Sequence, residues 1–156
     1  FKRSRKILLE NSAHEGGKRG WNLEELGQMI KGVPSRIRDQ VGVCIDTAHA
    51  YGAGVYDFGD ILDIKKFYED FDREIGLDHL WLFHLNDSMN STKKADDALF
   101  GSHKDRHQNL GLGYIFGGSR EYLEKHSQEG GIVWECNRKE ALVDFFHRLI
   151  PVEFLL

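Results

Sequence analysis

Four short apolar runs, each followed by a carboxylate or a histidine, constrain the fold of this chain more than any other feature of its sequence. Short continuous apolar runs are typical of strands that are buried on both faces of a parallel sheet. The runs cover residues 7–9, 41–45, 80–83 and 132–134. We therefore predict four buried, parallel strands.

Helical patterns alternate with these strands. Residues 22–31 place apolar side chains three or four positions apart, and Asn22 is well placed to cap the first turn. Residues 60–75 repeat the pattern, and a third helix is expected at 119–126, after a long polar loop at 86–118. This alternation predicts right-handed crossover connections within a parallel α/β sheet.

The spacing of the strands favours a barrel. The first three begin about 35 residues apart, which is close to the repeat of a (β/α)8 barrel, and a complete barrel needs about 250 residues. This chain has 156 residues and starts at Phe1, inside a charged stretch. An apolar helical stripe at residues 139–149 would suit a closing helix. We expect a fragment in one domain: the C-terminal half of a TIM barrel, with the N-terminal half absent.

The composition excludes several classes of protein. No apolar run approaches the roughly 18 residues of a membrane-spanning helix, and the basic N-terminus is not followed by an apolar region of roughly 7–15 residues, as in a signal peptide. Cys44 and Cys136 each lie inside an apolar run, which favours buried free thiols over a disulfide. We expect an intracellular protein, cytoplasmic or, in a eukaryote, nuclear, with no membrane partner.

The net charge leaves nucleic acid open as a partner. A formal charge of −4 argues against nonspecific binding through bulk charge. Bound metal ions, however, can cancel the charge of clustered carboxylates. The basic stretches at residues 1–6 and 93–94 are more typical of solvated surface than of DNA contacts.

Each predicted strand ends in a residue that can bind a metal ion: Glu10, Asp46, His84 and Glu135. The carboxyl ends of parallel strands meet at one edge of a sheet, where functional groups gather. Carboxylate and imidazole ligands together suit a divalent ion such as zinc or manganese. Any one of these residues could instead be a helix cap or an ordinary hydrogen-bonding group. Because all four predicted strands end in such a residue, the pattern indicates a metal site.

Two further clusters add candidate ligands. His49 follows Asp46 by three residues, and Asp105, Arg106 and His107 lie together in the long loop. In an extended segment Asp105 and His107 face the same side and can bind one ion, while Arg106 points elsewhere, toward a phosphate. So many carboxylates in one place need cations to neutralise them. We therefore favour a centre with several metal ions.

Five segments carry a further signal in their order and spacing. They are LLENSA at 8–13, GVCIDTAHA at 42–50, HLNDS at 84–88, GSHKDRH at 101–107 and LGLG at 110–113. In this order they resemble the signature segments of the endonuclease IV family, also called AP (apurinic/apyrimidinic) endonuclease family 2. The resemblance spans residues 7–136 and implies a TIM barrel of the xylose-isomerase-like superfamily, of which this chain would be the C-terminal half.

The resemblance also implies a cluster of three zinc ions, with manganese as an alternative metal. Glu10 would bridge two of the ions. The remaining ligands of the second ion would be Asp46, His84 and Glu135. The ligands of the third would be His49, Asp105 and His107. The first ion also needs two histidines from earlier strands, so this chain would fully ligate two of the three sites.

The activity implied by the resemblance is DNA repair. The substrate would be double-stranded DNA with abasic sites, cleaved 5′ to the site to leave a 3′-hydroxyl. Glu10 and Glu135 would be the catalytic residues, Glu10 by holding two ions and Glu135 by orienting or deprotonating the attacking water. Arg106 would contact a DNA phosphate, although it could equally serve as an ion-pair partner. The full-length protein would be a monomer.

Two other functions compete with this one. A metal-dependent sugar isomerase or epimerase of the same superfamily also places carboxylates and a histidine at strand ends, but it does not need His49, Asp105 and His107. A non-catalytic remnant is the other alternative. Half a barrel exposes apolar strand edges, and the loss of the other half would remove part of the active site.

Overall fold

The computed structural model describes residues 6–89, 99–109 and 112–116 of the chain. The predicted strand at 132–134, the predicted helix at 119–126 and the closing helix lie outside the described residues. Glu135 and Cys136 lie outside them as well.

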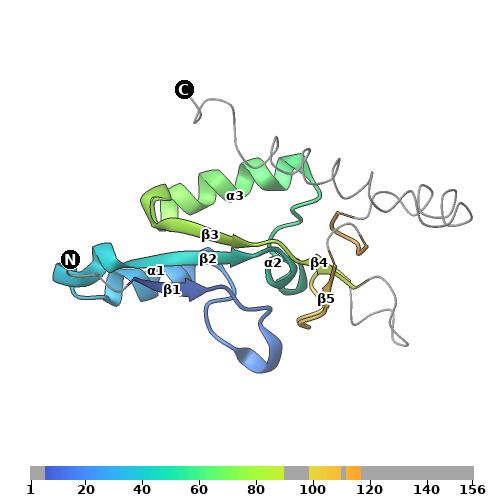
Figure 1. The fold of residues 1–156 in the computed structure, drawn as a ribbon, viewed down its shortest axis with the longest axis horizontal. Helices are drawn as coiled ribbons and strands as arrows, with labels where there is room; N and C mark the ends of the chain where they lie inside the picture. Colours follow the sequence, from blue (N-terminus) through green and yellow to red (C-terminus); the bar gives the residue numbers. More distant parts are fainter. Residues whose placement is uncertain (1–5, 90–98, 110–111, 117–156) are drawn as a thin grey trace, which may run out of the picture.

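Three parallel strands form the centre of the structure (Figure 1). They are β1 (Ile7–Glu10), β2 (Val41–Asp46) and β3 (Leu80–His84), paired in the order β1-β2-β3. Asp46 at the end of β2 is level with His84 at the end of β3. The predicted parallel arrangement of the first three strands is confirmed, and their carboxyl ends lie at one edge of the sheet.

Two amphipathic helices pack on one face of this sheet, α1 (Leu23–Gly32) and α3 (Ile61–Glu74). The side chain of Asn22 accepts a hydrogen bond from a backbone amide in the first turn of α1, and Asp60 does the same for α3. These caps satisfy amides that have no partner inside the helix. Both predicted helices are confirmed, and so is the predicted cap of α1 by Asn22.

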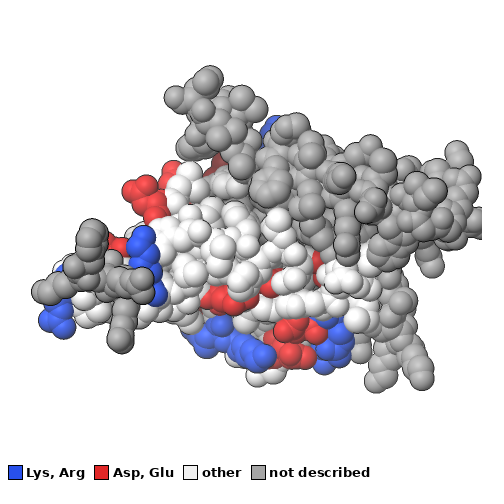
Figure 2. Space-filling model, viewed as in Figure 1, with Lys and Arg blue, Asp and Glu red and all other residues white. Residues whose placement is uncertain are grey.

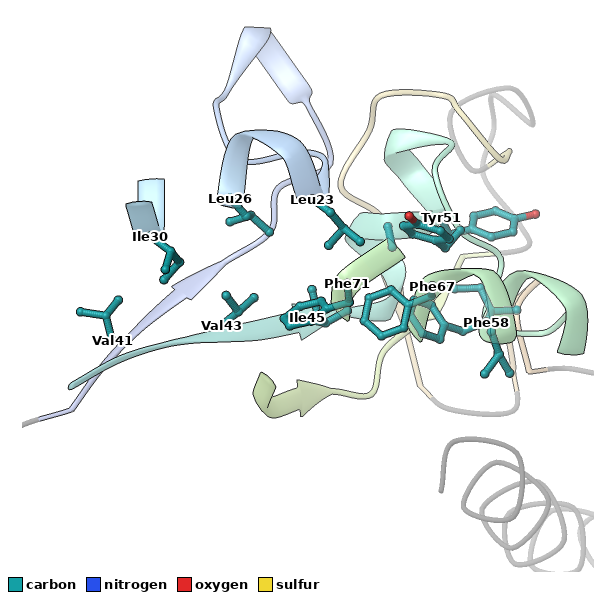
Figure 3. Packing of buried hydrophobic residues seen from close by; sticks show 14 residues of the cluster. Leu23, Leu26, Ile30, Val41, Val43, Ile45, Tyr51, Phe58, Phe67 and Phe71 are labelled. Atoms are coloured by element: carbon teal, nitrogen blue, oxygen red, sulfur yellow. The ribbon is translucent and has the colours of Figure 1, made fainter. Parts of the chain in front are cut away.

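The hydrophobic core lies between these helices and the sheet. Figure 3 shows apolar side chains of α1 and β2 facing one another, with Phe67 and Phe71 of α3 beside Ile45. Phe67 and Phe71 are fully buried, and each such side chain contributes about 1.5–3 kcal/mol to folding. The two helices approach closely at Gly27, where a β-carbon would lie 2.7 Å from the carbonyl oxygen of Glu74. The close-packed core therefore holds α1 and α3 against one face of the sheet.

The opposite face of the sheet is open at its outer strands. Leu8 on β1 and Leu82 on β3 are 41% and 42% exposed, whereas all of β2 is buried. The prediction that every strand is buried on both faces is therefore wrong for β1 and β3. In the described sheet each of these outer strands has one neighbouring strand, while β2 has two.

Several short elements were not predicted. The helix α2 (Thr47–Ala53) begins directly after β2, and two-residue strands β4 (Asp87–Ser88) and β5 (His107–Gln108) pair antiparallel within the segment predicted as loop. The short 3-10 helices are η1 (Glu15–Gly17), η2 (Ser35–Gln40) and η3 (Leu77–His79). The prediction of an uninterrupted loop at 86–118 is therefore wrong. Strands of two residues are too short to produce a recognisable apolar period in the sequence. None of the helices in the described ranges is long and apolar enough to cross a membrane.

Asp87 ties the segment 112–116 to β4. Its carboxylate is fully buried and accepts hydrogen bonds from the backbone amides of Gly113, Ile115 and Phe116. Burial raises the pKa of Asp87, and the amide donors act in the opposite direction. A single buried carboxylate thus anchors a segment that has no regular secondary structure of its own.

Candidate metal centre

Six of the seven predicted ligands come together at the carboxyl end of the sheet. The three strands, the first turn of α2 and the segment around β5 supply them: Glu10, Asp46, His49, His84, Asp105 and His107. The seventh, Glu135, lies outside the described residues. Residues separated by almost a hundred positions in the sequence therefore share one site.

Glu10 stands between two histidines. Its Oε1 lies 3.0 Å from Nδ1 of His84 and 3.7 Å from Nδ1 of His49. The two histidines come from β3 and α2, on either side of the carboxylate. One oxygen of Glu10 is therefore close to an imidazole of each of these elements.

Asp46 is the most firmly held of the six. It is only 1% exposed. Its Oδ1 caps α2 by accepting hydrogen bonds from the amides of Ala48 and His49, and its Oδ2 accepts one of 2.6 Å from the side chain of Asn86. Oδ2 also lies 3.7 Å from Nε2 of His107. One oxygen of Asp46 therefore holds the helix, while the other faces the site.

Asp105 joins the two remaining histidines. Its Oδ2 lies 3.3 Å from Nε2 of His49, and its Oδ1 lies 3.1 Å from Nε2 of His107. The two imidazole rings are 5.0 Å apart between centroids. The predicted proximity of Asp105 and His107 is confirmed, and His49, which the sequence analysis grouped with them, lies in the same cluster.

These donors fit a zinc-class ion in both chemistry and spacing. Two ligands bonded at about 2.0–2.1 Å in a tetrahedral site lie roughly 3.3 Å apart, and the separations between carboxylate and imidazole atoms here run from 3.0 to 4.0 Å. Asp46, His49 and His107 offer ligand atoms that all lie within 4.8 Å of one another. Three carboxylates in one place repel each other unless cations separate them. The residues present therefore suit divalent metal ions.

Cys44 lies close to this cluster without sharing its chemistry. It is a buried free thiol, as predicted, and its Sγ lies within 4.8 Å of ligand atoms of Glu10 and His84. Burial, together with the charge of Glu10, raises the pKa of Cys44 to about 11. A thiol must lose its proton to bind a metal, so the metal-free protein holds Cys44 in the form that does not bind one.

Arg106 turns back onto the backbone beside it. One guanidinium nitrogen donates a 2.8 Å hydrogen bond to the carbonyl oxygen of Asp105, and the side chain is partly buried. Contact with a DNA phosphate stays a prediction.

Three polar residues that the sequence analysis did not single out hold the ligands in place. Asn11 binds both backbone groups of Asp46, and the hydroxyl of Thr47 donates a 2.6 Å hydrogen bond to the carbonyl oxygen of Asn86. Asn86 in turn holds the carboxylate of Asp46. Each of the three lies within two residues of a predicted strand-end ligand, and that adjacency was the signal in the sequence that could have revealed them.

The described surface mixes charges of both signs. Figure 2 shows carboxylate side chains next to lysines and arginines along one edge of the described part of the molecule. Any binding of a polyanion would therefore depend on a local metal centre rather than on a uniform basic surface.

Comparison with known proteins followed this description. A protein-family model described as "Xylose isomerase-like TIM barrel" matches residues 2–147. Proteins named "Probable endonuclease 4" are also similar to this chain. That of Alkaliphilus oremlandii (strain OhILAs) is 46% identical over 109 residues, which make up 70% of this chain and 34% of that protein.

Two further relatives carry the same name. The protein of Clostridium botulinum (strain Alaska E43 / Type E3) is 46% identical over 110 residues, covering 70% of this chain and 35% of that protein. The protein of Geobacillus sp. (strain WCH70) is 41% identical over 122 residues, covering 78% of this chain and 37% of that protein. This chain thus spans about a third of the length of the curated relatives that it matches.

Proposed function

The chain belongs to the xylose isomerase-like TIM barrel family, and we propose that it is part of a metal-dependent endonuclease that repairs DNA at abasic sites. The observation that carries this proposal is the meeting of six metal-binding side chains at one end of the sheet. The name endonuclease 4, borne by relatives 41–46% identical to this chain, supports the same function. In this proposal the three described strands belong to a single barrel.

We propose zinc as the metal, with manganese as the alternative. Glu10 would bridge two ions, and Asp46, His84 and Glu135 would complete the second. His49, Asp105 and His107 would hold a third. Two carboxylates that each lie close to imidazole nitrogens support more than one metal position: Glu10 lies 3.0 Å from His84, and Asp105 lies 3.1–3.3 Å from His107 and His49. Ions bound there would supply Lewis acidity, activating water and stabilising the charge of a phosphate.

The side chains of this chain would then orient the reaction. Glu10, whose Oε1 lies 3.0 Å from Nδ1 of His84, would fix the distance between two ions. Glu135 would orient the attacking water or accept its proton, and Arg106 would bind a phosphate of double-stranded DNA. Cleavage would occur 5′ to the abasic site and leave a 3′-hydroxyl. A protein with this role would act inside the cell, and we propose that it is a monomer at full length.

The alternative of a sugar isomerase or epimerase uses the same strand-end ligands. It leaves the cluster of His49, Asp105 and His107 without a role, although the structure brings all three within 3.3 Å contacts of one another through Asp105. Binding a phosphate beside a metal pair is a use for these additional donors. The second cluster therefore favours phosphodiester hydrolysis over sugar isomerisation.

A cleavage assay combined with metal analysis tests this proposal. The protein encoded by the whole source gene is incubated with a labelled duplex that carries one abasic site, and with the same duplex without it. We expect zinc in the purified protein, one cut 5′ to the site, and loss of cutting on removal of zinc. The 156-residue chain assayed in parallel would distinguish an incomplete enzyme from an active one.

Three outcomes separate the alternatives. Isomerisation of an aldose without cleavage of the duplex would favour the sugar enzyme. Zinc binding without either reaction would favour a non-catalytic remnant. Absence of both metal and cleavage from the whole gene product would refute the proposed function.

A further inference from the structure

Asn11 connects the ends of β1 and β2. It is 5% exposed. Its side-chain Oδ1 accepts a 2.6 Å hydrogen bond from the amide of Asp46, and its Nδ2 donates one of 3.1 Å to the carbonyl oxygen of Asp46. Its backbone amide donates to the carbonyl oxygen of Cys44. One buried side chain therefore occupies both backbone hydrogen-bonding groups of a predicted metal ligand.

The side-chain amide of Asn11 takes the place of a backbone peptide. In a parallel ladder the next peptide of β1 would donate to and accept from β2. Here β1 ends at Glu10 and the chain turns away, so the amide of Asn11 continues the pairing as far as Asp46. The last backbone pair of the two strands is Glu10 with Cys44. The side chain of Asn11 therefore fixes the position of Asp46 relative to Glu10 past the end of this pairing.

Asn11 also faces His49 with its backbone carbonyl. That oxygen lies 2.8 Å from Nδ1 of His49. A carbonyl oxygen can only accept, so Nδ1 must carry the hydrogen. Nε2 is then the metal-binding atom of the neutral ring, and it points to Asp105 at 3.3 Å. Two acceptors at this distance are favourable only when a cation or a proton lies between them.

From these contacts we propose that Asn11 is a positioning residue of the metal centre. It holds the backbone of Asp46 next to the end of β1 through its side chain, and it selects the tautomer of His49 that leaves Nε2 available to a metal. Asn11 thus links the strand-end ligands to the cluster around Asp105. The inference rests on the proposed metal centre and deepens it, but it does not depend on which bond the enzyme cleaves.

The test measures metal binding rather than activity alone. The whole gene product is prepared as wild type, Asn11→Ala, Asn11→Ser and Gln28→Ala. Gln28 is a matched control, because its amide lies on the exposed face of α1 and binds only Glu24 among the described contacts. Zinc affinity is measured by competition with a chelator. The visible absorption spectrum of the cobalt-substituted protein reports the geometry of the site, and thermal unfolding of the metal-free protein reports its stability.

We expect Asn11→Ala to weaken zinc binding roughly 10- to 100-fold, as for other residues that orient metal ligands, and to change the cobalt spectrum. Asn11→Ser, which keeps a small hydrogen-bonding group, should lose less, and Gln28→Ala should match the wild type. If Asn11→Ala does not fold without metal, Asn11→Ser decides the question. Zinc affinity and a cobalt spectrum unchanged in a folded variant would overturn the inference, even if thermal stability fell, because that pattern indicates a purely structural role.

The test also separates this inference from the proposed function. A wild-type protein that binds zinc but does not cut abasic DNA would refute the endonuclease and leave the role of Asn11 intact. If the wild type cuts abasic DNA and Asn11→Ala binds zinc as tightly as the wild type, the endonuclease stands and the role of Asn11 is refuted. A wild-type protein that binds neither zinc nor cobalt would overturn both.

Discussion

The two groups of ligands at the metal centre are held in different ways. The strand-end group comprises Glu10, Asp46 and His84, which close three neighbouring strands of the sheet. The second group comprises His49, Asp105 and His107, which depend on α2 and on the two-residue strand β5. The strand-end group thus rests on the core, whereas the second group rests on short local elements.

Burial shows what this difference means for single residues. The side chain of Asp46 is 1% exposed and that of Asp105 is 38% exposed. Asp46 caps a helix and binds Asn86 as well as facing the site, whereas the described contacts of the Asp105 carboxylate are with the two histidines His49 and His107. Asp46 therefore combines folding with metal binding, while Asp105 serves metal binding nearly alone.

The largest expected contrast follows from removing one carboxylate of each group. Asp46→Ala should lower the free energy of unfolding of the metal-free protein by about 2–4 kcal/mol, because it removes a helix cap and leaves buried donors without a partner. Asp105→Ala should change it by less than about 0.5 kcal/mol, because the side chain is partly exposed and its removal relieves repulsion. Both variants should lose zinc. Urea denaturation and elemental analysis measure the two effects.

Asp39→Ala, at an exposed position, is the control for loss of a surface carboxylate. Equal destabilisation by Asp46→Ala and Asp105→Ala would contradict the division into two groups.

The same division explains how much the sequence could predict. Apolar runs that stop at Glu10, Asp46 and His84 are visible in the sequence, because the buried strands produce them, and the structure confirms their convergence. The elements that carry the second group, α2 and β5, leave no such pattern. Thr47 and Ala48 continue the buried run of β2, so the start of helix α2 could not be separated from the strand by its burial.

The positioning residues were hidden for another reason. Asn11, Thr47 and Asn86 act through partners that lie 35 to 40 positions away in the sequence. A single polar residue after a strand is compatible with a turn, a cap or a ligand support. Only the alignment of neighbouring strands distinguishes these roles, and this alignment is a property of the folded sheet.

A second prediction tests how the second group is attached. Gly52 of α2 is in close contact with the segment that carries Asp105: a β-carbon on Gly52 would lie 2.6 Å from the carbonyl oxygen of Lys104. Gly52→Ala should therefore displace this segment, lower the free energy of unfolding by about 1–2 kcal/mol and weaken metal binding at the second group. Denaturation and zinc stoichiometry of the same preparation measure both.

Gly32→Ala is the matched control, because a β-carbon there has nothing within 4 Å. Replacing this glycine at the end of α1 should stabilise the protein by about 0.5 kcal/mol and leave metal binding unchanged. Full zinc stoichiometry and affinity in Gly52→Ala would show that the second group does not depend on this contact.

A third prediction uses a buried carboxylate outside the metal centre. Burial alone would raise the pKa of Asp70, but hydrogen bonds from Lys66, Tyr56 and Arg73 outweigh it and lower the pKa to about 2. The ordinary value is 3.8, so the resulting stabilisation is fully present above about pH 4 and is lost as the pH falls toward 2. Asp70→Asn should therefore lower the free energy of unfolding by about 1–2 kcal/mol at pH 7. The effect is moderate because the cationic partners are largely exposed to solvent.

The difference between wild type and Asp70→Asn should shrink between pH 4 and about 2 in urea denaturation of the metal-free protein. Zinc content at pH 7 should stay the same, in contrast to Asp46→Ala. A difference in stability that does not change with pH would show that Asp70 contributes through its shape rather than its charge.

The smallest effect is expected for Cys44, which lies among the strand-end ligands but does not resemble them chemically. Its pKa of about 11 reflects burial and the nearby charge of Glu10, so a metal would have to displace a firmly held proton to bind the sulfur. Cys44→Ala should cost about 1 kcal/mol or less in urea denaturation and leave zinc affinity and the cobalt spectrum unchanged. Loss of a charge-transfer band in the cobalt protein would instead make the thiol a ligand, and the strand-end group would then extend two positions deeper along β2, into the buried interior of the sheet.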